Sequence, residues 1–121
     1  MAGYRELIVW QRGMLLAETV YEFTSRFPKE EIFGLTSQIR RASVSVPSNI
    51  AEGYGRGTMR ELVHFLRIAR GSAAEAETQI ILSTRLSFAA PQEAEILAQQ
   101  YRELQRMIGS LILKLEKKNN L

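Results

Sequence analysis

The stretch Ile39–Gly57, with the sequence IRRASVSVPSNIAEGYGRG, decides the fold of this chain. Its apolar and small residues recur at steps of three and four, which is the period of a helix and not of a strand. They are Ile39, Ala42, Val46, Ile50 and Gly53. Small side chains on such a face let a neighbouring helix approach closely. The stretch therefore predicts a central, tightly packed helix.

A proline lies inside this pattern, at Pro47. Proline has no N–H for the carbonyl of Ser43 and bends or breaks a helix. It either kinks one helix or divides two, and we favour one kinked helix because the apolar stripe keeps its phase across Pro47. Three closely spaced glycines then end the helix. Asn49 and Gly53 are expected at helix–helix contacts in the bundle centre.

A first helix is expected on the N-terminal side, from about Leu7 to about Arg26. Its apolar stripe follows the helical period and comprises Val9, Gly13, Leu16, Val20, Phe23 and Phe27, widened by Trp10, Ala17 and Tyr21. Phe27-Pro28 ends this helix, since a residue before proline avoids helical backbone angles. We expect Lys29-Glu30-Glu31 to open the second helix, which continues through Ile32 and Leu35 into the central stretch.

Two more helices are expected on the C-terminal side. Thr58 with Glu61 fits a capping box that opens the third helix, whose buried face is predicted to be Leu62, Phe65, Ala69, Ala73, Ala76, Ile80 and Ser83. The third helix should fade near Phe88. Pro91 suits the first turn of the fourth, which carries Ala94, Leu97, Tyr101, Leu104, Ile108, Leu111 and Leu115. Four helices with short connections predict an all-α, up-down-up-down four-helix bundle over residues 1–121, as a single domain.

Composition narrows the class of protein further. The chain has 121 residues, of which 45% are hydrophobic, and it contains no cysteine. No apolar run is long enough to span a membrane, and the N-terminus lacks the apolar region of a signal peptide. The absence of cysteine fits a reducing compartment. These features predict a cytoplasmic protein without disulfides or thiol catalysis.

Catalytic constellations are not apparent in the sequence. Glu61-x-x-His64 matches half of a di-iron motif, but such a site needs two copies and His64 is the only histidine. We interpret the pair as a capping glutamate and a solvated histidine. A metal-dependent nuclease would have to use Glu52, Glu75 and Glu77, because aspartate is absent. We expect no enzyme activity, no cofactor and no metal, with a small nuclease as the less favoured alternative.

Positive charge is concentrated in the middle of the chain. The formal net charge is +3, and residues 40–70 hold six arginines against two glutamates. Arginine forks suit phosphate groups, and a local basic patch is typical of nucleic-acid binding. A solvated face is the alternative interpretation. The candidate nucleic-acid-binding residues are Arg40, Arg41, Arg56, Arg60, Arg67 and Arg70.

These segments resemble a known bacterial family. Val9-Trp10-Gln11, residues 27–31, residues 34–42, Pro47-Ser48-Asn49-Ile50-Ala51-Glu52-Gly53, residues 69–72 and residues 75–79 come in the family's order and cover nearly the whole chain. The chain is similar to the four-helix-bundle family of 23S rRNA intervening-sequence proteins, and departs most from its pattern at residues 87–95.

The resemblance implies a homopentamer of four-helix bundles in the bacterial cytoplasm. It also implies kinship with the accessory protein of diversity-generating retroelements, a basic pentamer that binds a reverse transcriptase and nucleic acid. The expected partners are therefore further copies of this chain, RNA or DNA, and a nucleic-acid enzyme, with no membrane. A scaffold or accessory subunit without nucleic-acid contact is the alternative function.

Overall fold

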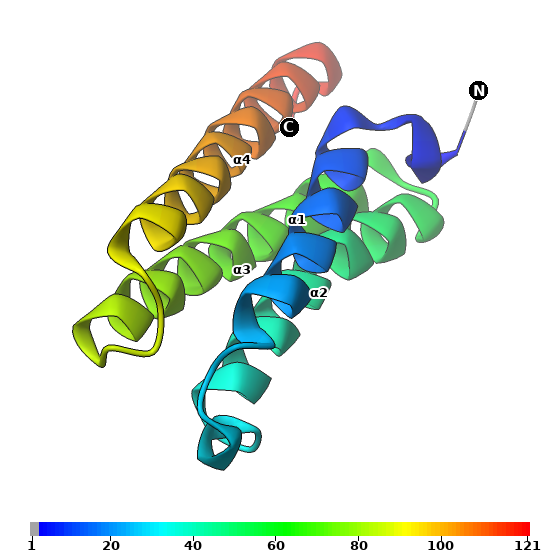
Figure 1. The fold of residues 1–121 in the computed structure, drawn as a ribbon. Coiled ribbons are helices and arrows are strands. Elements are labelled where there is room, and N and C mark those ends of the chain that lie inside the picture. The colour runs from blue at the N-terminus through cyan, green and yellow to red at the C-terminus, as the bar shows by residue number, and fades with distance from the viewer. Residues whose placement is uncertain (1–2) are drawn as a thin grey trace.

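A computed structural model describes residues 3–121, which form four long helices (Figure 1). In chain order they are α1 (Ile8–Thr24), α2 (Leu35–Gly55), α3 (Met59–Arg85) and α4 (Pro91–Asn119). Short 3-10 turns precede the first two helices, η1 at Tyr4–Glu6 and η2 at Lys29–Glu31. The described part of the chain contains no strand. The predicted all-α, up-down-up-down bundle is confirmed.

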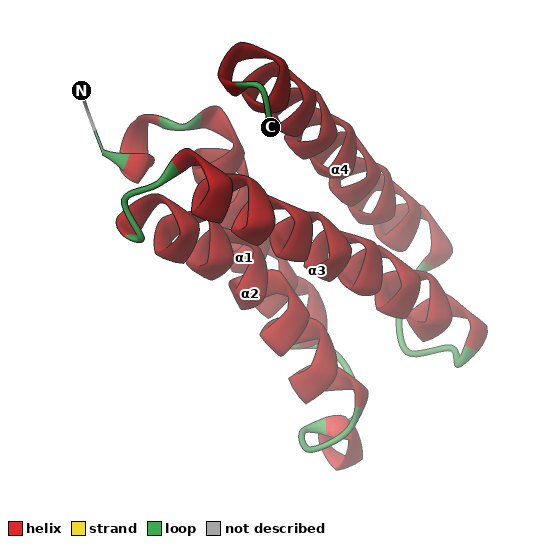
Figure 2. Cartoon of the chain, turned by 180° about the vertical axis from the view of Figure 1, so that it is seen from behind, coloured by secondary structure: helices red, strands yellow, loops and turns green. Residues whose placement is uncertain are grey.

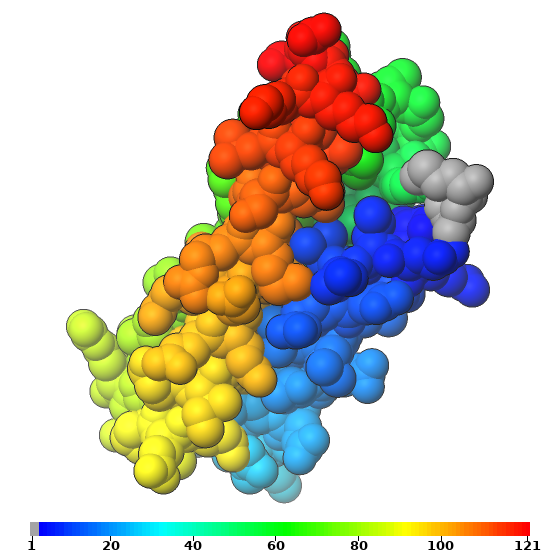
Figure 3. Space-filling model, turned by 90° about the horizontal axis from the view of Figure 1, so that it is seen from above, coloured from blue at the N-terminus to red at the C-terminus, as the bar shows by residue number. Residues whose placement is uncertain are grey.

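Each helix packs mainly on the helix that precedes or follows it in the chain. α2 lies along α3, and α3 lies between α2 and α4 (Figure 2). α1 packs chiefly on α2 and meets α4 less extensively. The space-filling view shows α1, in blue, beside the orange and yellow part of α4 (Figure 3). α2 and α3 therefore form the centre of the bundle, as the sequence of α2 indicates.

α2 runs without interruption through Pro47, so this proline does not divide it. The pyrrolidine ring is buried against α1, where a Cβ added to Gly13 would lie 3.4 Å from Pro47 Cδ and 3.3 Å from Val46 Cγ1. Gly13 thus lets the two helices approach closely at the proline. The bend that Pro47 should cause in the helix axis stays a prediction.

The second helix begins later than the sequence suggested. η2 is a separate turn, and Gly34 lies after it with φ and ψ angles of −111° and −120°, which are neither helical nor extended. The Glu31 carboxylate accepts a hydrogen bond from the Leu35 N–H at 3.0 Å and so helps to satisfy the start of α2. Ile32 consequently lies outside the helix and is exposed.

The hydrophobic core follows the predicted stripes with a few shifts. The largest fully buried side chain is Tyr101 of α4, and Ile39, Ile50 and Leu104 are buried with it. Tyr21, which was expected to widen the buried stripe of α1, is instead exposed, and Phe65 is only half-buried. Arg40 and Arg56 lie over these two rings. Among residues 3–121, no helix is long and apolar enough to cross a membrane.

The predicted cap of α3 is present. The Thr58 hydroxyl accepts a hydrogen bond from the Glu61 N–H at 3.2 Å. The Glu61 carboxylate does not complete the reciprocal half of a capping box, because it pairs with Arg56 at 3.5 Å. α3 therefore starts from a single side-chain cap.

Replacing Thr58 by alanine should lower the free energy of unfolding by about 1 kcal/mol, because one N-terminal N–H of α3 loses its acceptor. Chemical denaturation followed by circular dichroism measures this change. Thr78→Ala in the same helix is the matched control, since its hydroxyl only bonds back to the Ala74 carbonyl. Equal effects of the two substitutions would show that the Thr58 cap contributes nothing specific.

Candidate nucleic-acid interface

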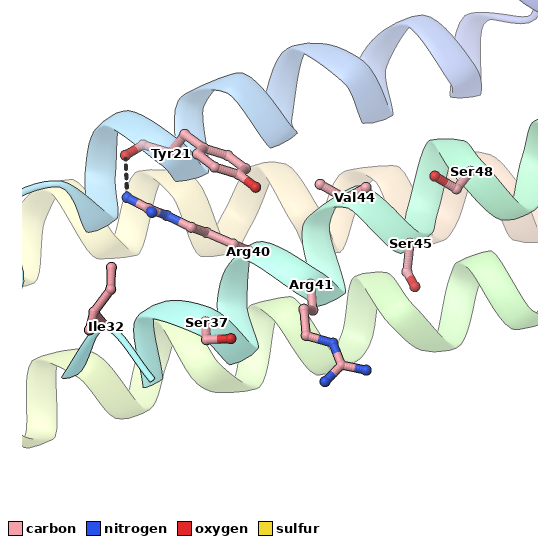
Figure 4. Close-up of a pocket in the computed structure, with 8 residues that line it drawn as sticks. All are labelled: Tyr21, Ile32, Ser37, Arg40, Arg41, Val44, Ser45 and Ser48. Carbon is pink, nitrogen blue, oxygen red and sulfur yellow. Dashed lines mark hydrogen bonds between the residues drawn. The ribbon is translucent and has the colours of Figure 1, made fainter. Parts of the chain in front are cut away.

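Arg40 occupies the groove between α1 and α2 (Figure 4). Its Nε donates a hydrogen bond to the buried Thr24 hydroxyl at 2.9 Å, and its guanidinium carbon lies 4.6 Å from the centre of the Tyr21 ring. A second guanidinium nitrogen donates to the Tyr21 carbonyl at 3.5 Å. Arg40 is thus half-buried and held by α1, and its fixed position leaves only part of the guanidinium for a ligand.

Arg41 points away from Arg40, on the α3 side of α2 (Figure 4). It is exposed and lines a polar cleft of about 290 Å³ together with Gln38, Ser45 and Glu75. No carboxylate of residues 3–121 lies within ion-pair distance of its guanidinium. Arg41 is therefore available to an anionic ligand.

Arg56, at the end of α2, is engaged within its own turn. Its guanidinium forms ion pairs with Glu52 at 2.7 Å and with Glu61 at 3.5 Å, and it lies 5.0 Å from the centre of the Phe65 ring. The hydrogen bond that Arg56 donates to the Glu52 carboxylate raises the pKa of the Arg56 guanidinium above its ordinary value. With two carboxylates beside it, Arg56 offers little net positive charge.

The three remaining arginines lie on the exposed face of α3. Arg67 forms an ion pair with Glu116 of α4. Arg70 also extends over α4, where its Nη1 would lie 3.2 Å from a Cβ added to Gly109. Within the described chain, neither Arg60 nor Arg70 has a carboxylate partner. These two, like Arg41, carry uncompensated charge.

The six arginines do not form one compact cluster. Arg41 and Arg56 are fifteen residues apart on α2, which corresponds to about 22 Å along a helix axis. Arg40 faces α1, whereas Arg67 and Arg70 face α4. The structure instead spreads free cations over two faces and the α2–α3 turn.

More positive charge stands at the end of the bundle that holds this turn. The ion pair from Arg67 to Glu116 places the last turns of α4 beside the first half of α3, and Figure 3 shows the red end of α4 next to green residues. Three exposed lysines lie on those turns: Lys114, Lys117 and Lys118. Lysines in the last turns of a helix also suit the negative end of its dipole, and their proximity to α3 depends on a register between helices that no local pattern encodes.

The carboxylates that a nuclease would need are separated and engaged elsewhere. Glu52 pairs with Arg56, Glu75 accepts a hydrogen bond from Gln79 at 3.4 Å, and Glu77 pairs with Arg102. Over residues 3–121, no three side chains of the metal-binding types are grouped to hold an ion. His64 is exposed and packs edge-to-face on Phe65. Among the described residues, these carboxylates and His64 therefore do not assemble into a metal site.

The fold and this surface define a class of small helical-bundle proteins with arginines dispersed over outer helix faces. Comparison with known families then places the chain. It belongs to the family of 23S rRNA-intervening sequence proteins, whose family model matches residues 5–110. The resemblance seen in the sequence is therefore confirmed.

A solved structure supports the same fold. The chain is similar to a protein of unknown function from the S23 ribosomal protein family of Bacteroides thetaiotaomicron VPI-5482, with 22% sequence identity and a TM-score of 0.77. The match covers 87% of this chain and 98% of that one. At this identity the likeness concerns the fold alone. No curated protein matches the chain.

Proposed function

We propose that this protein is a non-enzymatic homo-oligomer, of five copies by the resemblance described above, that binds the phosphate backbone of RNA or DNA. The observation that carries this proposal is that three of the six candidate arginines are exposed and have no carboxylate partner: Arg41, Arg60 and Arg70. Free guanidinium groups bind phosphate oxygens with paired hydrogen bonds. A cytoplasmic location is part of this proposal.

Charge pairing distinguishes these three arginines from several others. Arg26, Arg102 and Arg106 each pair with a glutamate. Outside residues 40–70, the exposed arginines without a carboxylate partner in the described chain are Arg5, Arg12 and Arg85. Repetition of weak sites in an oligomer raises avidity without new contacts. The family's name refers to an intervening sequence of 23S rRNA, which makes RNA the first nucleic acid to test.

The test is a triple variant, Arg41→Gln with Arg60→Gln and Arg70→Gln. Labelled single-stranded RNA and duplex DNA are titrated at several salt concentrations. The wild type should bind more weakly as salt rises, because bound phosphates release counterions. If each arginine contacts one phosphate, the triple variant should reduce the log–log salt slope by about two to three.

A matched triple variant controls for net charge. Arg26→Gln, Arg102→Gln and Arg106→Gln remove the same charge from arginines that already have glutamate partners. This control should bind nearly as the wild type does. Equal losses in both triple variants would indicate diffuse attraction without an arginine site, and the absence of wild-type binding at low salt would contradict the proposal.

An interaction scaffold is the second candidate function, and one observation favours it. The outer face of α1 and α2 carries an apolar groove lined by side chains such as Trp10, Met14 and Val44. Monomeric soluble proteins rarely leave large apolar patches uncovered. The test is a pull-down from which nucleic acid has been removed. Enrichment of one acidic protein by the wild type, and its loss when Arg41, Arg60 and Arg70 are replaced, would favour the scaffold function.

A further inference from the structure

Two adjoining hollows form one groove along the outer face of α1 and α2, which we call the α1–α2 groove. The first has a volume of about 540 Å³ and is mainly apolar, with Trp10, Met14, Pro47 and Ala51 in its walls. The second, of about 440 Å³, contains Arg40 and Arg41 (Figure 4). The hollows share three lining residues: Tyr21, Val44 and Ser48. The groove is thus apolar at one end and basic at the other.

The loop before α2 presents an exposed aromatic side chain that could fill an apolar hollow. Phe33 is 95% exposed, the highest value of any large apolar side chain in the described chain. It follows Lys29, Glu30 and Glu31 and precedes Gly34, and we call residues 29–34 the Phe33 loop. Aromatic side chains bury large areas and often anchor protein interfaces. A phenylalanine in full contact with water at the tip of a loop fits the anchor of an intermolecular contact.

Phe33 does not enter the apolar hollow of its own chain. It is 95% exposed, and its loop reaches the other end of the groove, where Ile32 lines the basic hollow. α2 begins at Leu35, and Pro47 and Ala51 of the apolar hollow lie twelve and sixteen residues further, which is about 18 and 24 Å along a helix axis. Within one chain Phe33 and the apolar hollow therefore stay apart, whereas two copies can bring them together.

The charges of the loop and the groove also match. Glu30 has no cationic partner within residues 3–121, and Arg40, which lies in the basic hollow, has no carboxylate partner there. Lys29 is likewise free of carboxylates in the described structure, while Glu18 lines the apolar hollow. The loop and the groove thus present opposite charges around an apolar centre, which gives an interface its orientation.

We propose that Phe33 of one copy inserts into the apolar hollow of the α1–α2 groove of a second copy. The contact joins two different surfaces, so it repeats from molecule to molecule and closes into a ring when the rotation per copy permits. The inference rests on the self-association in the proposed function and assigns its interface. It uses none of Arg60, Arg67 and Arg70, which stay exposed on α3.

Phe33→Ser tests the loop side of this contact. Because Phe33 touches so little of its own chain, the variant should stay folded and keep the helical circular-dichroism spectrum of the wild type. Analytical ultracentrifugation at micromolar concentrations should show an assembly for the wild type and a particle near the chain mass of 13.8 kDa for the variant. Leu113→Ser, which alters an apolar residue of α4 that is 69% exposed, is the matched control and should remain assembled.

The single tryptophan of the chain tests the groove side, since Trp10 lines the apolar hollow. In the assembled wild type its emission should be shifted to shorter wavelength and shielded from acrylamide. Phe33→Ser should shift the emission to longer wavelength and increase quenching, whereas Leu113→Ser should leave both unchanged. Met14→Glu, which places charge in the hollow, should dissociate the assembly as Phe33→Ser does.

Three results would overturn the inference in distinguishable ways. A monomeric wild type over the whole concentration range would refute both self-association and this interface. An assembled wild type with an equally assembled Phe33→Ser variant would refute the interface alone and leave the proposed assembly intact. Dissociation of Phe33→Ser without any change in Trp10 emission or quenching would show that Phe33 binds a different surface.

Discussion

Substitution of Gly53 by leucine is expected to lower the free energy of unfolding by about 1–3 kcal/mol, as overpacking of a filled core does. Gly53 is buried where α2 meets α3. A Cβ added there would lie 2.6 Å from Phe65 Cβ and 3.4 Å from both Leu62 Cα and the Leu62 carbonyl oxygen. Backbone atoms cannot move aside as a flexible side chain can, so the two central helices would have to separate.

Gly71→Ala provides the control for the loss of a glycine. Gly71 lies in the middle of α3, and a Cβ added there would meet no atom within 4 Å. That substitution should raise stability by about 0.5–1 kcal/mol, because alanine is the better helix former. Denaturant unfolding of both variants measures the contrast. A wild-type midpoint for Gly53→Leu would mean that α2 and α3 do not pack at this position.

A second large effect is expected at high pH. The Tyr101 side chain is fully buried in the core. Among residues 3–121 its Oη has no hydrogen-bond partner, and the nearby Ser43 hydroxyl donates to the Arg40 carbonyl at 2.8 Å. Burial raises the pKa of the Tyr101 phenol well above its ordinary value of 10.0, and the Ser43 hydroxyl offsets a smaller part of that rise. The folded protein thus keeps this proton when the unfolded chain has lost it.

The sign of the pH dependence follows from this difference. Below pH 10 both states hold the proton, and Tyr101 adds no pH dependence. As pH rises from 10 toward the raised folded value, only the unfolded chain releases the proton, so the free energy of unfolding falls by about 1.4 kcal/mol per pH unit. Urea unfolding at pH 9, 10 and 11 measures this slope.

Tyr101→Phe isolates the contribution of this phenol. The variant keeps the ring and removes the ionisable hydroxyl, so its stability should fall less steeply between pH 10 and 11 than that of the wild type. At pH 7 the variant should be at least as stable as the wild type, because the substitution removes a buried hydroxyl that has no hydrogen-bond partner. Parallel pH profiles for the two proteins would show that Tyr101 does not remain protonated in the folded state.

Local sequence patterns predicted the helices well, because capping, proline placement and apolar period act within a few residues. Pro91 and Thr58 mark the starts of α4 and α3 as expected. The start of α2 was wrong because Gly34 interrupts the helical backbone and the Glu31 side chain caps Leu35. Gly34, a residue that destabilises a helix interior, was the signal that could have located this start.

The candidate interface was less predictable than the helices. The predicted buried stripe of α3 includes none of Arg60, Arg67 and Arg70, and the structure has all three exposed. It could not show that Arg67 meets Glu116, a residue 49 positions away, because that ion pair depends on how α3 and α4 align. The same holds for Arg40, whose partners Thr24 and Tyr21 belong to α1. Identifying which arginines are free requires the packed bundle.

The packing of each helix on its sequence neighbour has a consequence for folding kinetics. Most interhelical contacts join segments separated by one short connection, such as the turn between Gly55 and Met59. Closing a short connection costs little chain entropy, and chains dominated by local contacts fold rapidly. We expect the α2–α3 hairpin, which has the most interhelical contacts, to form first and α1 and α4 to add to it. The contacts between α1 and α4 join segments that are far apart in the sequence, so they should form last.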